Sequence, residues 1–154
     1  MAELKARLRS DLTQAMKSQD RLRTATLRML LAAITNEEVS GKESRELSDA
    51  DVIKVLAKES KKRGESAEIY TQNGRGELAA NERAEAQVID EYLPTPFTDA
   101  ELADVVDTAI ADVAEELGER PSMRQMGQVM KTATALAAGK ADGARISAAV
   151  KSRL

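Results

Sequence analysis

Residues 91–118 read EYLPTPFTDAELADVVDTAIADVAEELG, and they hold the clearest structural boundary in the chain. Two prolines spaced by one residue force an extended segment, because neither proline fits inside a helix. Directly after them, Thr98 and Glu101 have the spacing of a helix-capping box. Apolar residues then recur at helical spacing for about four turns, up to Gly118, a residue type that commonly ends helices. The stretch therefore predicts a break followed by a long amphipathic helix.

Helical periodicity continues on both sides of this boundary. We predict an all-α fold with four helices in residues 1–94, a hinge at Tyr92–Pro96 that includes Pro94, and three shorter helices in residues 97–154. The apolar stripes of the predicted helices span residues 4–16, 27–34, 52–56, 86–93, 102–117, 123–130 and 146–154, and the third helix is expected to continue to about residue 70.

The composition favours helices and excludes several chemistries. The chain has 154 residues, of which 42% are hydrophobic, 32% are charged and only three are aromatic, which suits a helical globular protein. It has no cysteine and no histidine, so disulfides, cysteine-ligated metals and imidazole bases are excluded. We expect no metal, no cofactor and no autonomous active site. Because no apolar run approaches the roughly 20 residues of a membrane span and no signal peptide opens the chain, we expect a cytoplasmic protein without membrane contact.

Charge is unevenly distributed, although the formal net charge is only −3. Residues 1–94 hold 16 basic and 17 acidic residues, and residues 95–119 hold eight acidic residues and no basic one. Residues 120–154 hold seven basic residues and one acidic residue. The C-terminal part is therefore expected to combine an acidic first helix with two basic helices.

Six polar residues of the basic segment form a candidate nucleic-acid site. They are Arg124, Gln128, Lys131, Lys140, Arg145 and Lys151. The first three follow helical spacing and are expected to share one helix face, the fourth lies in a turn, and the last two lie on the final helix. Such a basic face suits a polyanion, because phosphate contacts release counterions and require no particular sequence. The alternative is that these bases neutralise the acidic helix or form a solvated surface.

Short motifs in both halves of the chain follow one order. The closing part contains Met126–Lys131, Gly139–Gly143 and Val150–Leu154. The N-terminal half contributes the segments 27–30, 33–36, 61–63 and 91–94. Together these motifs resemble the GatB/YqeY family, small proteins related to the tail of the B subunit of the tRNA-dependent Asn/Gln amidotransferase. The resemblance covers nearly the whole chain.

The resemblance implies a four-helix bundle joined to a three-helix bundle, which agrees with the number of predicted helices. It also implies contact with tRNA through the C-terminal unit, because the amidotransferase tail helps to hold the tRNA body. A formal association with carbon–nitrogen ligase activity, with glutamine as amido donor, comes with the family. The glutamine chemistry itself takes place in other parts of that enzyme.

Several residues have two explanations each. Gly127 suits either close approach of a nucleic-acid backbone or tight helix packing, and we favour packing. The turn from Gly139 places a helix N-terminus where a phosphate could bind, but we expect Asp142 to cap that helix instead. Tyr92 could stack on a base, but we favour a contact between the two domains.

A basic run on the third predicted helix also has two explanations. Lys58, Lys61, Lys62 and Arg63 could form a binding patch, but acidic residues are interleaved with them and Glu59 lies at the pairing distance from Arg63. We therefore expect a solvated helix face with salt bridges.

We predict a non-catalytic module that binds tRNA or structured RNA through its basic C-terminal helices, with shape setting the selectivity. The rival hypothesis is a protein–protein adaptor. In that case the acidic helix or the N-terminal helices would dock an aminoacyl-tRNA synthetase or an amidotransferase.

Overall fold

The computed structural model describes residues 2–154, and every regular element in that range is helical. The prediction of an all-α fold is confirmed. The chain divides into two compact units, unit 1, which ends at Leu93, and unit 2, which begins at Pro94.

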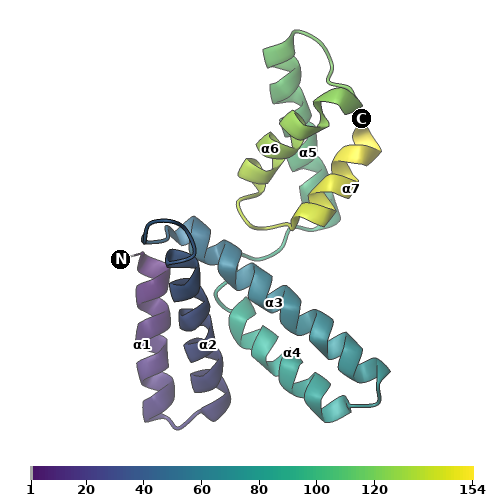
Figure 1. Ribbon diagram of the computed structural model, residues 1–154. Helices are drawn as coiled ribbons and strands as arrows, with labels where there is room; N and C mark the ends of the chain where they lie inside the picture. The colour runs from purple at the N-terminus through teal and green to yellow at the C-terminus, as the bar shows by residue number, and fades with distance from the viewer. Residues whose placement is uncertain (1) are drawn as a thin grey trace. The chain divides into compact units, whose positions relative to one another are not determined.

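Unit 1 contains four helices. They are α1 (Glu3–Lys17), α2 (Arg21–Glu38), α3 (Asp49–Gln72) and α4 (Gly76–Asp90). Helix α1 packs along α2, and α3 packs along α4 as a long hairpin (Figure 1). The two pairs share a core of fully buried leucines and isoleucines, among them Leu8, Leu27 and Ile89. The outer part of the hairpin extends beyond this core, and its buried apolar residues are the small Ala67 and Ala79.

Local side-chain bonds explain where the helices of unit 1 begin. The Asp20 carboxylate accepts a hydrogen bond from the Arg23 amide at 3.0 Å, which caps α2. The Ser48 hydroxyl accepts one from the Asp51 amide at 3.2 Å, which caps α3. Each cap satisfies an amide that has no partner in the first helical turn.

A buried ion pair in unit 1 was not predicted. Glu38 is the last residue of α2 and lies buried against Lys5 of α1. Lys5 Nζ is 2.7 Å from Glu38 Oε1, and the Leu47 amide donates to Glu38 Oε2 at 3.3 Å. The hydrogen bond from Lys5 holds the pKa of Glu38 below its usual value. The two residues are 33 positions apart in the sequence, so the local residue pattern does not predict this ion pair.

Unit 2 contains three α-helices and one 3₁₀ turn. They are α5 (Asp99–Leu117), η1 (Met123–Gln125), α6 (Met126–Ala137) and α7 (Gly143–Arg153). The core contains fully buried valines from all three α-helices, Val106, Val129 and Val150 among them. Thr98 and Glu101 form the predicted capping box, with each side chain bonded to the other residue's amide.

Candidate nucleic-acid interface

The candidate residues of unit 2 lie on three different elements and in the turn before α7. Ser122 starts a 3₁₀ turn, where its hydroxyl accepts a hydrogen bond from the Arg124 amide at 3.3 Å. Arg124 therefore precedes α6 and does not belong to it. The spacing that linked it to Gln128 and Lys131 assumed an α-helix throughout, but a 3₁₀ turn has about 3.0 residues per turn instead of 3.6. The α-helical argument therefore holds only for Gln128 and Lys131.

Helix α6 carries one paired amide and one unpaired cation. Gln128 Nε2 donates a hydrogen bond to Glu116 Oε2 of α5 at 3.0 Å, so this side chain is used within the unit. Lys131 is exposed, and its side chain makes no hydrogen bond or ion pair with any described residue.

Lys140 and Arg145 bind the first residues of unit 2, around the start of α5. The Phe97 amide donates to the Lys140 carbonyl at 2.8 Å, and the Lys140 ammonium lies 5.3 Å from the centre of the Phe97 ring. Arg145 Nη2 donates to the Phe97 carbonyl at 2.9 Å and pairs with Asp99 Oδ1 at 3.1 Å. These contacts tie the segment before α5 to the start of α7, so both cations have a structural use.

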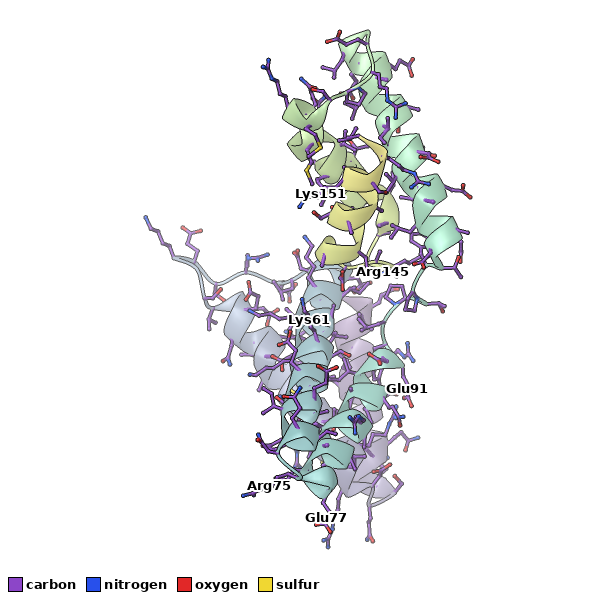
Figure 2. The ribbon with its side chains drawn as sticks, turned by 90° about the vertical axis from the view of Figure 1, so that its right-hand side faces the viewer. Lys61, Arg75, Glu77, Glu91, Arg145 and Lys151 are labelled. Atoms are coloured by element: carbon purple, nitrogen blue, oxygen red, sulfur yellow. The ribbon has the colours of Figure 1, made fainter. Side chains whose placement is uncertain are left out.

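Lys151 has a different environment although it shares α7 with Arg145 (Figure 2). Six residues separate the two, which places them about 120° apart around the helix. Arg145 is half-buried against the segment before α5, whereas Lys151 is exposed and has no partner among the described residues.

The basic side chains of unit 2 therefore fall into two groups. Four are used within the fold, since Arg153 pairs with Asp107 at 2.6 Å and Arg120 donates to the Arg153 carbonyl at 2.8 Å, in addition to Lys140 and Arg145. Three are exposed and make no side-chain contact with a described residue. We call these three the unpaired set: Arg124, Lys131 and Lys151.

The environment of Gly127 contradicts the packing explanation. Gly127 is exposed in the first turn of α6, and a Cβ built on it would meet nothing within 4 Å. Tight helix packing therefore does not account for a glycine here. Gly127 lies between Arg124 and Lys131 in the sequence, and the surface above it is open.

The turn between α6 and α7 is closed by its own side chains. Gly139 has φ of +84°, a conformation that favours glycine. The Asp142 carboxylate accepts a hydrogen bond from the Arg145 amide at 2.8 Å and caps α7. Because a phosphate at this helix end would compete for the same donor, the cap is the better explanation of the motif.

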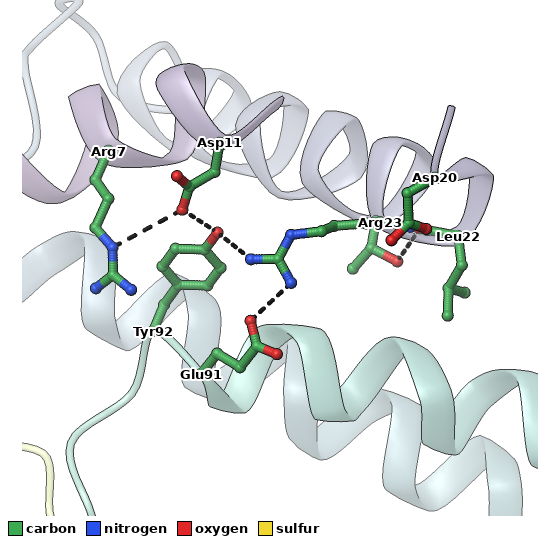
Figure 3. A network of polar contacts seen from close by, with 8 residues as sticks. Arg7, Asp11, Asp20, Leu22, Arg23, Glu91 and Tyr92 are labelled. Carbon is green, nitrogen blue, oxygen red and sulfur yellow. Dashed lines mark hydrogen bonds and ion pairs between the residues drawn. The ribbon is translucent and has the colours of Figure 1, made fainter. Parts of the chain in front are cut away.

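Tyr92 is held inside unit 1 and is not available to a base (Figure 3). Its hydroxyl donates to Asp11 Oδ2 at 2.5 Å and accepts from Arg23 Nη2 at 3.1 Å. The Arg7 guanidinium lies 4.7 Å from the centre of its ring, and Arg23 also pairs with Glu91 at 2.7 Å. Burial, followed by the bond to Asp11, raises the pKa of Tyr92 to about 12. All of these contacts lie inside unit 1, where the polar network fixes the end of α4 on α1 and α2, and the favoured contact between the domains stays a prediction.

The surface of unit 2 has a depression whose charged groups already bond within the unit. It has a volume of about 350 Å³ and is lined by α5 residues and Arg120. Its Asp107 and Arg120 both bond to Arg153. Within residues 2–154, no group of three or more acidic residues is placed to hold a metal ion. Over the same range, no helix has both the length and the apolarity needed to cross a membrane.

The all-helical fold agrees with the family suggested by the motifs. The profile of the family described as YqeY-like protein matches residues 5–154, and the chain belongs to this family. The resemblance predicted from the sequence is confirmed.

Curated relatives come from several yeasts. Proteins of Meyerozyma guilliermondii, Vanderwaltozyma polyspora and Eremothecium gossypii are 31%, 30% and 31% identical to this chain over 124, 116 and 126 residues. The matches cover 79%, 74% and 80% of this chain and 64%, 62% and 68% of the relatives. Each relative is named "Altered inheritance of mitochondria protein 41, mitochondrial". The chain thus spans about two thirds of the length of these relatives, and slightly less for the first two.

These names contradict the prediction of a cytoplasmic protein. The prediction depended on the lack of a membrane span and of a signal peptide, and a mitochondrial protein needs neither. Relatives at about 30% identity are named as mitochondrial, so the features of the sequence do not indicate the cytoplasm.

Proposed function

We propose that this protein binds tRNA or another structured RNA through the unpaired set of unit 2, without catalysing a reaction itself. The contrast inside unit 2 carries the proposal. Four basic side chains make contacts that hold the fold, whereas Arg124, Lys131 and Lys151 are exposed and contribute no such contact. Exposed cations of this kind are available to phosphates, and the release of counterions supplies the affinity.

Shape is the proposed source of selectivity. Binding to single-stranded bases depends on several exposed aromatic side chains. Here Tyr92 is buried in a polar network and Phe97 is covered by Lys140, which leaves only the half-buried Tyr70 of unit 1. Contacts to the phosphate backbone position an RNA without reading its bases. Arg124 can form two parallel bonds with one phosphate, whereas Lys131 and Lys151 act as point charges.

Open space at Gly127 supports the same surface. A Cβ would meet nothing there, so the fold itself does not require a glycine. An approaching backbone would require one, because any side chain at a close contact keeps the two chains apart. The family's relation to the tail of the amidotransferase B subunit favours tRNA among structured RNAs, and we propose no independent ligase activity.

We further infer that the two units behave as a four-helix bundle and a three-helix bundle with a hinge at Pro94 and Pro96. The support is the division of the chain at Leu93 and Pro94 and the separate core of each unit. Two prolines in three residues prevent either helix from continuing across the boundary.

The test is fluorescence anisotropy of labelled bulk tRNA titrated with protein at several salt concentrations. Wild type is compared with Arg124→Gln/Lys131→Gln/Lys151→Gln and with a control of equal charge change, Lys17→Gln/Arg21→Gln/Lys42→Gln. We expect the first variant to bind more weakly and to lower the slope of log affinity against log salt by about 2–3, since each lost phosphate contact lowers it by roughly 0.7–0.9. The control should follow wild type, and a DNA duplex of similar length should bind less tightly.

Equal losses in both variants would contradict the unpaired set as the binding site. No binding by wild type at low salt would contradict the function and favour the adaptor hypothesis. That second candidate has its own support, since acidic residues of α5 and the segment after it are exposed and make no side-chain contact with a described residue. These residues are Asp104, Asp112, Glu115 and Glu119.

A further inference from the structure

Four lysines form a row on the outer face of α3. Lys54, Lys58 and Lys62 follow one another at intervals of four residues, and Lys61 lies beside them (Figure 2 labels Lys61). All four are exposed, and none of their side chains makes a hydrogen bond or ion pair with a described residue. We call these four residues the lysine row.

Arg63, the neighbour of the row, has the opposite environment. Its guanidinium contacts Glu59 at 3.3 Å on α3 and Glu85 at 3.2 Å on α4, and its side chain is only 15% exposed. The predicted pair between Glu59 and Arg63 is confirmed. The prediction of salt bridges is wrong for the lysines. Of the interleaved acidic residues, Glu59 contacts Arg63 instead, and Glu65 and Glu68 are exposed and form no ion pair with a described residue.

The spacing of the lysines in the row does not stabilise the fold. Like charges four residues apart on a helix repel one another and destabilise it. Lys54 with Lys58 and Lys58 with Lys62 are two such pairs in succession. No described acidic side chain forms an ion pair with these lysines to offset the repulsion. A negatively charged partner outside unit 1 would explain their arrangement.

We propose that the lysine row of unit 1 is a second surface that binds the phosphates of structured RNA. The proposal rests on the function proposed above. The row spans eight residues, which is about 12 Å along the helix axis, and it presents one sign of charge over that length. Point charges on flexible side chains suit a phosphate backbone, where contacts position the ligand without reading its sequence.

An RNA fits the row better than a lipid surface does. A helix that lies on a membrane buries its apolar face between the lipids. Beside the row, the apolar face of α3 is occupied, since Val52 and Leu56 are fully buried in the core of unit 1. The row therefore offers charge alone.

Lysine footprinting on the full-length wild-type protein tests the proposal. Lysines are acetylated briefly with and without bulk tRNA, and the modification of each is quantified by mass spectrometry. We expect at least a threefold protection of the lysine row by tRNA, and no protection of the exposed Lys17 and Lys42 in the same unit.

The same experiment separates the two proposals, because Lys131 and Lys151 report on the unpaired set. Protection of these two without the row would overturn the inference and leave the proposed function intact. Protection of the row alone would support the inference and overturn the assignment of the unpaired set. No protection anywhere would overturn both.

Variants supply the second readout. Lys54→Gln/Lys58→Gln/Lys61→Gln/Lys62→Gln should weaken tRNA binding and lower the salt slope by about 3–4, from the loss of roughly 0.7–0.9 per contact. A control with the same charge change is Lys17→Gln/Arg21→Gln/Lys42→Gln/Arg75→Gln, which should bind like wild type. If the row variant binds tRNA like the control but loses binding to vesicles of phosphatidylserine and phosphatidylcholine, the RNA proposal is overturned.

Discussion

At position 127, we expect the stability of the fold to favour alanine and the binding of tRNA to favour glycine. Alanine is favoured over glycine in a helix by up to about 1 kcal/mol, and a Cβ has free space at this position. We therefore expect Gly127→Ala to raise the free energy of unfolding, measured by urea denaturation, while lowering the affinity for tRNA. Gly76→Ala, in the first turn of α4 and also without a Cβ contact, is the control that should raise stability without changing affinity. Unchanged tRNA binding by Gly127→Ala would remove the argument for close approach.

Tyr92 acts through its hydroxyl, which joins α1, α2 and the end of α4. Tyr92→Phe loses bonds to Asp11 and Arg23, so we expect the free energy of unfolding to fall by about 1 kcal/mol. The matched control is Tyr70→Phe, because the Tyr70 hydroxyl has no bond to a described residue. An equal effect of both substitutions would contradict a specific role for the network.

The raised pKa of Tyr92 also predicts a pH dependence. The folded protein keeps the phenolic proton up to about pH 12, whereas the unfolded chain loses it near the ordinary pKa of 10.0. The contribution is therefore complete below pH 10 and declines as the pH rises from about 10 to 12. The difference in thermal midpoint between wild type and Tyr92→Phe should shrink over that interval, and a constant difference would contradict the assignment.

At the scale of elements, we expect repulsion between lysines to lower the stability of helix α3. Lys58 has a like charge four residues away on each side, and each such pair destabilises a helix by about 0.2–0.5 kcal/mol. Lys58→Gln should therefore raise the free energy of unfolding by about 0.4–1 kcal/mol. Lys61→Gln is the control, because Lys61 has one like charge three residues before it, Lys58, and one opposite charge four residues after it, Glu65, so no net gain is expected. A loss of stability in Lys58→Gln would show that the row supports the fold.

The contact between α1 and α2 is expected to weaken in acid. Lys5 lowers the pKa of Glu38, so the pair contributes stability above the ordinary carboxyl pKa of 4.5, and that contribution is lost as the pH falls through the lower folded value. Lys5→Met should lower the thermal midpoint at pH 7 and should lose less between pH 7 and pH 3 than wild type does. Lys17→Met, an exposed lysine on the same helix, should behave like wild type over this range.

For the whole molecule, the sequence predicts features that depend on neighbouring residues, such as helix starts. It does not predict side-chain contacts between segments that are far apart in the sequence. Capping residues such as Ser48 and Thr98 locate helix starts because they bond to amides three residues away. The partners of Arg145 and Lys5 lie 46 and 33 residues away, so no local pattern identifies them. The segment of the candidate site stays a prediction, and the sequence did not show that half of its six side chains are used within the fold.

The most direct test of the central claim is amide chemical-shift mapping of the full-length protein during a titration with bulk tRNA. We predict that the largest changes fall on residues 124–131 and on Lys151, with smaller ones along residues 54–62. Residues of the Tyr92 network should not shift. Changes concentrated on the acidic face of α5, or no changes at low salt, would contradict RNA binding through the unpaired set.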